Sequence, residues 1–75
     1  MAHCSDLVMH VDDTLEENRR HDVEAAISRL QGVNEAHFNE KRPHLMLVSY
    51  DPVRISSFDI LAQMSGQNLC AERIG

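Results

Sequence analysis

The sequence predicts an α+β domain whose elements follow the order strand, helix, strand, strand, helix, strand. Three observations indicate this fold class. Apolar residues recur at helical spacing in segment 15–31, segment 44–50 (HLMLVSY) is almost wholly apolar, as in a central strand, and Gly32, Gly66 and both prolines lie between such segments. The 75 residues suffice for one small core, so residues 1–75 are predicted to form a single domain.

The first strand is predicted over residues 6–11 (DLVMHV), because apolar residues at alternate positions can all face the core. The first helix is predicted to begin near Leu15, where Thr14 and Glu17 have the spacing of a capping box. Gly32 is expected to end it, because glycine reaches the left-handed conformation of a helix terminus without strain. The apolar stripe of this helix is predicted to be Val23, Ala26, Ile27 and Leu30.

A hairpin is predicted next. Its first strand covers residues 33–39 and its polar turn covers residues 40–43, where proline removes a backbone donor. The second strand, residues 44–50, is the strongest in the chain. Asp51 and Pro52 end it, because proline disfavours the helical region for the residue before it.

The second helix is predicted from Ser56, which forms a capping-box pattern with Asp59, to about Ser65. Gly66 follows as its stop signal, and a short last strand is predicted over residues 68–74. The apolar stripe of this helix is predicted to be Phe58, Leu61, Ala62 and Met64.

This order predicts a ferredoxin-like βαββαβ sandwich, in which a four-stranded antiparallel sheet of order 4-1-3-2 carries both helices on one face. The face without helices would carry Val8, His10, Leu45 and Leu47. That set is more apolar than a solvated face requires, which indicates a contact surface for a protein partner or for a second copy of the chain.

Twelve acidic residues against seven Lys and Arg give a formal net charge of −5. This balance repels nucleic acid and anionic membrane surfaces. The two cysteines lie near opposite ends of the chain without CxxC spacing, which favours a reducing compartment over a disulfide framework. No apolar run is long enough for a signal peptide or a membrane span. We therefore expect a cytoplasmic protein that binds neither nucleic acid nor membranes.

Three segments carry a family signature: DVEAAISRLQGV at 22–33, LMLVSYDP at 45–52, and the helix, glycine and strand at 58–74. They resemble the heavy-metal-associated domains, which occur as small copper chaperones and as metal-binding modules of P-type ATPases. The resemblance spans nearly the whole chain. It implies the ferredoxin-like fold and a role in metal handling.

In that family, a Met-x-Cys-x-x-Cys motif before the first helix holds a soft ion such as copper(I) between two thiolates. Counting back from Gly32, the motif falls on residues 14–19, so Thr14 stands at the methionine position and Glu16 and Arg19 stand at the cysteine positions. Soft copper prefers sulfur to carboxylate, and a guanidinium is no ligand. We therefore expect no metal at the usual family site.

Arg19 is instead expected to form ion pairs with nearby carboxylates, which are Asp12, Asp13, Glu16 and Glu17. These four are also a candidate site for a hard ion such as magnesium or calcium. However, acidic residues are typical of a helix N-terminus, where the macrodipole favours negative charge, and the glycine of a calcium loop is missing.

The remaining candidate copper or zinc ligands are His3, Cys4, His10 and Cys70. If the first and last strands pair antiparallel, Cys70 comes near His10, whereas Cys4 lies toward the far end. The terminus Met1-Ala2-His3 also has the pattern that chelates copper(II) or nickel(II). Three other histidines are expected to be surface residues: His21, His37 and His44.

The sequence contains no nucleophile elbow, paired acid and base, or phosphate-binding glycine loop, so no enzymatic activity is predicted. The preferred hypothesis is a small non-enzymatic protein without the CxxC site, which acts through protein–protein contacts as an accessory in metal handling. The alternative is a metal carrier that uses the non-standard Cys/His site.

Overall fold

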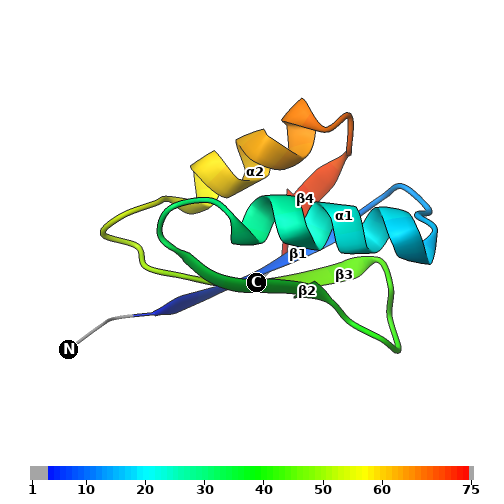
Figure 1. Cartoon of the computed structure of the whole chain (residues 1–75), viewed down its shortest axis with the longest axis horizontal. Helices are drawn as coiled ribbons and strands as arrows, with labels where there is room; N and C mark the ends of the chain where they lie inside the picture. Colours follow the sequence, from blue (N-terminus) through cyan, green and yellow to red (C-terminus); the bar gives the residue numbers. More distant parts are fainter. Residues whose placement is uncertain (1–3, 75) are drawn as a thin grey trace.

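The computed structural model describes residues 4–74. Its elements are β1 (Ser5–Val11), α1 (Glu17–Ser28), β2 (Val33–Phe38), β3 (Leu45–Tyr50), α2 (Ser57–Gly66) and β4 (Ala71–Arg73). Over these residues the sheet is antiparallel and four-stranded, with the order β2-β3-β1-β4. Both helices lie on one face of it (Figure 1). The predicted ferredoxin-like βαββαβ sandwich and its strand order are therefore confirmed.

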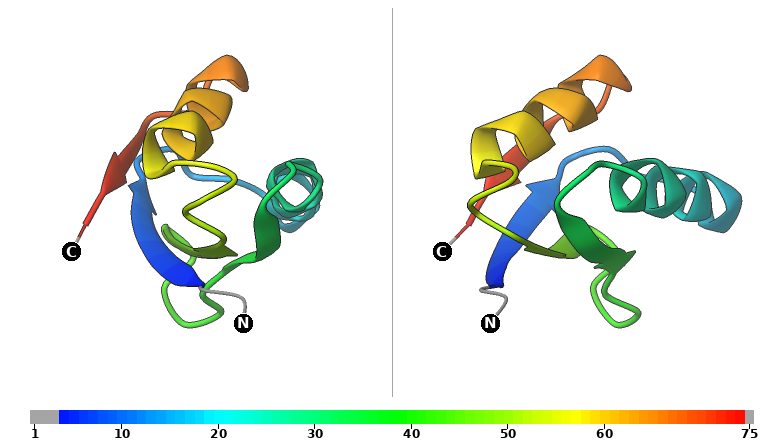
Figure 2. Two further views of the ribbon diagram at one scale, coloured as in Figure 1. Left: turned by 90° about the vertical axis from the view of Figure 1, so that its left-hand side faces the viewer. Right: turned by 60° about the vertical axis from the view of Figure 1, so that its left-hand side comes forward.

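The core lies between the sheet and the two helices. Figure 2 shows the sheet as one layer and the helices as the other. Strand alternation directs every second side chain of β1 and β3 toward the helices. These residues are buried: Leu7, Met9, Val11, Met46, Val48 and Tyr50. The predicted stripe of α1 packs onto them, with Val23 and Ile27 buried and Ala26 and Leu30 partly buried. This burial of aliphatic surface supplies the main stabilising term of the fold.

Helix α1 begins later and ends earlier than the sequence predicts. Its N-cap is Glu16, whose backbone is extended (φ −68°, ψ 158°) and whose side chain makes no capping hydrogen bond. The predicted capping box of Thr14 and Glu17 is therefore wrong. Hydrogen bonds to the segment before β4 keep the preceding loop out of the helix. At its other end α1 stops at Ser28, and Gly32 lies in the turn beyond.

Gly32 is required by the turn between α1 and β2. Its φ is +96°, in the left-handed region that favours glycine. Its carbonyl accepts a hydrogen bond of 2.7 Å from the Asp51 N–H, which joins this turn to the β3–α2 loop. A Cβ at this position would lie only 2.9 Å from Arg54 Cβ and 2.9 Å from Ile55 Cγ2.

We expect Gly32→Ala to lower the free energy of unfolding by about 1–3 kcal/mol, because alanine is strained at this φ and its Cβ meets side-chain carbons. Urea denaturation followed by circular dichroism measures the change. Gly66→Ala is the matched control, since nothing lies within 4 Å of a Cβ there. It should be neutral or stabilising by up to about 1 kcal/mol. Equal stabilities of both variants would contradict the strained turn.

Helix α2 begins as predicted. Ser56 is the N-cap, and its hydroxyl and the Asp59 carboxylate each accept a hydrogen bond from the other's backbone N–H, so the capping box is confirmed. The predicted stripe is partly wrong. Phe58 is 80% exposed and Ala62 is exposed, whereas the buried residues of the helix are Ser57, Ile60 and Met64.

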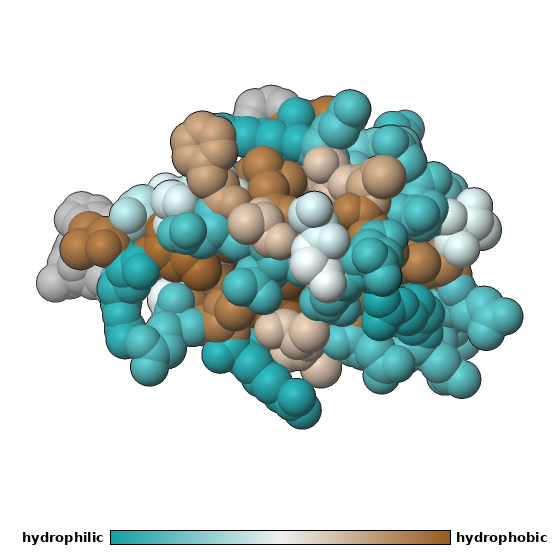
Figure 3. Space-filling view, turned by 90° about the horizontal axis from the view of Figure 1, so that it is seen from above, coloured by the Kyte–Doolittle hydropathy of each residue, from teal (hydrophilic) through white to brown (hydrophobic). Residues whose placement is uncertain are grey.

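On the side of the molecule that carries the helices, the exposed apolar side chains gather toward one end. Figure 3 views this side and shows apolar side chains between hydrophilic ones, gathered toward the end that carries the β3–α2 loop. Val53 in that loop is 86% exposed. Within residues 4–74 neither helix has the length and apolar character needed to cross a membrane.

Candidate functional site

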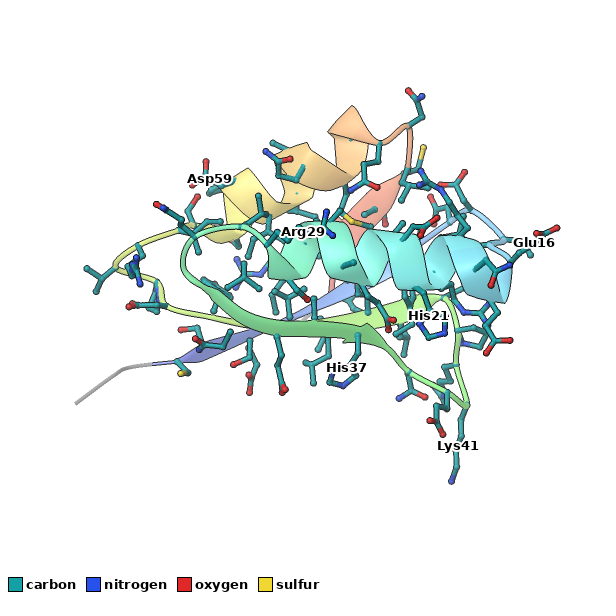
Figure 4. All side chains as sticks on the ribbon, viewed as in Figure 1. Glu16, His21, Arg29, His37, Lys41 and Asp59 are labelled. Carbon is teal, nitrogen blue, oxygen red and sulfur yellow. The ribbon has the colours of Figure 1, made fainter. Side chains whose placement is uncertain are left out.

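The loop that enters α1 carries Thr14 and Glu16, and Arg19 follows it, which are the residues that the sequence resemblance places at the metal-binding motif. Thr14 is exposed and Glu16 is the exposed N-cap of α1. Figure 4 shows the Glu16 side chain pointing away from the body of the protein. Arg19 follows in the first turn and is partly buried. None of the three supplies sulfur, so the expectation that this loop lacks a soft-metal site rests on its chemistry rather than on its shape.

Three hydrogen bonds hold this loop. The Asp12 N–H donates to the Cys70 carbonyl at 2.8 Å, and the Cys70 N–H donates to Asp13 Oδ2 at 2.8 Å. Arg20 Nη1 donates to the Leu15 carbonyl at 2.6 Å. The Asp12 backbone and the Asp13 carboxylate therefore connect β1 to the segment before β4. The Asp12 carboxylate lies 2.9 Å from His10 Nδ1 instead, so each of these two carboxylates has a partner within the protein.

Arg19 does not form the ion pairs that the sequence suggested. Its Nη2 donates to the Gln67 carbonyl at 3.2 Å, so it links the start of α1 to the α2–β4 connection. In the described part of the chain, contacts at ion-pair distance all involve histidine, and they are His10–Asp12, His21–Glu17 and His21–Glu24. Arg19 binds the Gln67 carbonyl rather than a carboxylate because the α2–β4 connection lies beside the first turn of α1.

The two cysteines are far apart. Cys4 precedes β1 and its Sγ accepts a hydrogen bond of 3.0 Å from Asn34 Nδ2, whereas Cys70 lies beyond the other end of β1. The seven residues of β1 separate these ends by about 20 Å. His3 lies outside the described residues. Over residues 4–74, no three His, Cys, Asp or Glu side chains come together to hold a metal ion.

The rings of His10 and His44 are stacked where β1 ends. Their ring centroids are 5.7 Å apart and their planes differ by 14°. His10 Nδ1 is 2.9 Å from Asp12 Oδ1, and His44 Nδ1 is 2.7 Å from the Val11 carbonyl oxygen. A carboxylate and a carbonyl only accept hydrogen bonds, so both Nδ1 atoms donate. In each neutral ring the free lone pair is therefore on Nε2.

A groove of about 670 Å³ runs between α1 and the β2–β3 hairpin. Its polar groups contact one another. Glu24 Oε2 accepts a hydrogen bond of 2.6 Å from the Phe38 N–H, and its Oε1 lies 3.3 Å from His21 Nδ1. Figure 4 shows His21 facing the hairpin that carries Lys41. Glu24 thus satisfies an N–H of the edge strand β2, which is a structural role.

Sequence reasoning placed His44 on the surface by itself, and the structure places it beside His10. The available signal was the register of the two central strands. Residues 6–11 and residues 44–50 each contain one histidine, so an antiparallel pairing of the two strands can bring these two residues close together. Only the observed register, in which His10 lies opposite Leu45, shows that they do meet.

Comparison with known proteins gives the fold. No family model and no curated protein matches the sequence. Solved structures do match. Oxidized MerP from Ralstonia metallidurans CH34 has a TM-score of 0.85 at 14% identity, covering 97% of this chain and 100% of that chain. A copper binding domain from HMA7, a P-type ATPase, has a TM-score of 0.83 at 21% identity and 93% coverage of both chains.

The CopZ metallochaperone is also similar, with a TM-score of 0.78 at 18% identity over 93% of this chain and 100% of that chain. These alignments cover 93–97% of this chain, so they concern the whole architecture rather than one motif. Together with the strand order and the two helices on one face, they show that this chain has the fold of the heavy-metal-associated domains.

Proposed function

We propose that this protein is non-enzymatic and acts through protein–protein contacts, as an accessory in metal handling. The observation that carries the proposal is the environment of Arg19. A guanidinium stands at the second cysteine position and donates to the Gln67 carbonyl at 3.2 Å. With Glu16 at the first position, this loop is closed by the protein's own groups and offers no soft ligand.

The metal-handling part of the proposal is supported by the similar structures, which include a copper binding domain and a metallochaperone. A fold that carries metal in those proteins can keep its docking surfaces after the thiolates are replaced. An accessory of this kind would bind a protein component of the same system without carrying copper(I) in the loop.

The proposed contact surface consists of Val8, His10, Leu45 and Leu47. In the register of β1 and β3, Val8 lies opposite Leu47 and His10 lies opposite Leu45. All four are partly exposed on the sheet face away from the helices. Ile74, which is 40% exposed and whose N–H donates to the Val8 carbonyl, extends this apolar strip past the edge of β1.

Carboxylates border this surface. Asp6 on β1, Glu35 on β2 and Glu72 on β4 occupy the open-face positions of their strands and are exposed. Two copies that meet through the contact surface bring these borders together, so their repulsion opposes the burial of apolar side chains. Salt screens the repulsion between exposed charges and leaves the apolar term in place.

The first partner to test is a second copy. In buffer with EDTA, sedimentation velocity should show weak self-association that strengthens with added sodium chloride. Leu47→Asp should weaken it by at least about tenfold, the equivalent of about 1.4 kcal/mol, because it puts a charge inside the contact surface. Val53→Asp is the control, since Val53 is 86% exposed in the β3–α2 loop. A strictly monomeric protein at every salt concentration would remove the second copy as partner.

The second candidate function is that of a metal carrier with a non-standard site. A specific observation favours it, namely the two adjacent imidazoles of His10 and His44 with their Nδ1 atoms already engaged. The expected pairing of His10 with Cys70 remains a proposal. Titration with zinc while recording backbone amide shifts tests both, because shifts confined to His10 and one of these two neighbours identify the second ligand.

A further inference from the structure

The imidazoles of His10 and His44 have the hydrogen bonding of metal ligands. A ligating histidine usually donates its other ring N–H to a carboxylate or a backbone carbonyl, which orients the ring and raises its basicity. His10 Nδ1 has the Asp12 carboxylate at 2.9 Å, and His44 Nδ1 has the Val11 carbonyl at 2.7 Å. Both orienting partners are thus in place, one of each chemical kind.

The separation of the ring centroids is close to that of two imidazoles bound to one ion. Two imidazoles bound through Nε2 to a tetrahedral zinc, with Zn–N of about 2.0–2.1 Å, have centroids about 5 Å apart. The observed separation is 5.7 Å. The His10 side chain is 44% exposed, so an ion from solvent can reach it. The rings are stacked with their planes 14° apart, and the Nε2 lone pair lies in the plane of each ring, so the rings must also turn toward one another before both Nε2 atoms point at one ion.

The pair supplies only half of the ligands that zinc requires. Structural zinc sites hold four protein ligands, and within residues 4–74 no third His, Cys, Asp or Glu joins a group able to hold a metal ion. We propose that His10 and His44 form a half-site for Zn²⁺, which the same two residues of a second copy complete. The inference rests on the proposed function in one respect, the use of the contact surface.

The surroundings of the pair support a second copy as the source of the missing ligands. His10 lies opposite Leu45 and belongs to the same sheet face as Val8 and Leu47, so a twofold axis near the histidines brings apolar strips of both copies together. Each chain carries a formal net charge of −5, and the carboxylates bordering this face repel their counterparts. A divalent cation on the axis lowers this repulsion where the copies are closest.

The test uses zinc, because imidazole nitrogens are among its usual protein ligands and zinc has no redox chemistry of its own. The full chain with Cys4→Ser and Cys70→Ser removes competing thiolates. Sedimentation velocity with and without zinc chloride, together with the zinc content after gel filtration, gives the mass and stoichiometry. We expect a dimer with one zinc per two chains, and at least about a tenfold increase in dimer affinity over buffer with EDTA, or about 1.4 kcal/mol.

His10→Asn and His44→Asn test the ligands. An asparagine amide can keep the hydrogen bond that Nδ1 makes but offers no Nε2, so the fold is retained while the ligand is lost. Each should abolish the effect of zinc on the dimer. His37→Asn is the matched control, since His37 is an exposed histidine of β2 opposite Leu47, and Figure 4 shows it on the same side of the sheet. It should respond to zinc like its parent.

Asp12→Asn tests the orienting carboxylate. Loss of such a partner typically costs about 10- to 100-fold in metal affinity. A ¹⁵N spectrum of the imidazoles distinguishes orientation from a general loss of structure, because zinc should shift Nε2 of both histidines while Nδ1 stays protonated. In Asp12→Asn this signature should weaken for His10 and persist for His44 at saturating zinc.

Three outcomes overturn the half-site: a monomer with one zinc per chain, a zinc-dependent dimer that His10→Asn and His44→Asn leave unchanged, or no zinc response in the folded parent. The last result, with self-association intact in EDTA, removes the half-site and leaves the proposed function standing. If the chain is monomeric in EDTA and forms a zinc-bridged dimer, the half-site is correct. The proposal that two copies associate through the contact surface without metal is then wrong.

Discussion

Phe38→Ala should lower the free energy of unfolding by about 3–5 kcal/mol, because it removes a large buried ring and leaves a cavity in the core. Phe38 is 7% exposed and faces the helices from β2. A domain of 75 residues has a total stability of roughly 4–11 kcal/mol, at about 0.05–0.15 kcal/mol per residue. The variant should therefore be unfolded in part at room temperature, as urea denaturation followed by circular dichroism would show.

Phe58→Ala is the matched control, as these are the two phenylalanines of the chain. Phe58 is 80% exposed on α2, so its truncation should change the free energy of unfolding by no more than about 0.5 kcal/mol. The comparison also tests which face of α2 meets the sheet. If Phe58→Ala were as destabilising as Phe38→Ala, the stripe suggested by the sequence would be the buried one.

Glu16→Cys combined with Arg19→Cys should create a soft-metal site where the parent has none. The fold already presents these positions at the N-cap and in the first turn of α1, and two thiolates there select copper(I). Starting from Cys4→Ser and Cys70→Ser, we expect one equivalent of copper(I) to stay bound under a chelator concentration that strips the parent completely. Competition with a chromogenic copper(I) chelator measures this difference.

The single variants Glu16→Cys and Arg19→Cys are the controls, because each supplies one thiolate and should lose its copper(I) to the chelator. Arg19→Cys also removes the hydrogen bond to the Gln67 carbonyl, so its stability is measured in parallel. Tight copper(I) binding by the parent between Thr14 and Arg19 would contradict the view that replacement of the thiolates abolished the site.

Most of the architecture could be predicted because it depends on local patterns. Alternation placed β1, an almost wholly apolar run placed β3, and the turn residues placed the hairpin. The Ser56–Asp59 capping box located the start of α2 correctly, since it involves only neighbouring backbone groups. A similar pattern at Thr14 and Glu17 failed, because there the loop bonds to Cys70 and its surroundings, which are distant in sequence.

The candidate site was harder to predict for the same reason. Arg19 was expected to find a nearby carboxylate, but its partner is the carbonyl of Gln67, 48 residues away. The neighbour of His44 was also not predicted. Its neighbour His10 comes from another strand, and the contact between the rings depends on a register that no local pattern specifies.

The sequence by itself determined the order of the elements, the fold class and the absence of thiolates from the loop before α1, because periodicity, turn residues and ligand chemistry are properties of neighbouring residues. The tertiary structure alone decided which face of α2 is buried, what Arg19 binds, and that His10 meets His44 with both Nδ1 atoms engaged. These three features depend on strand register and on helix placement, and both are set by contacts across the whole core.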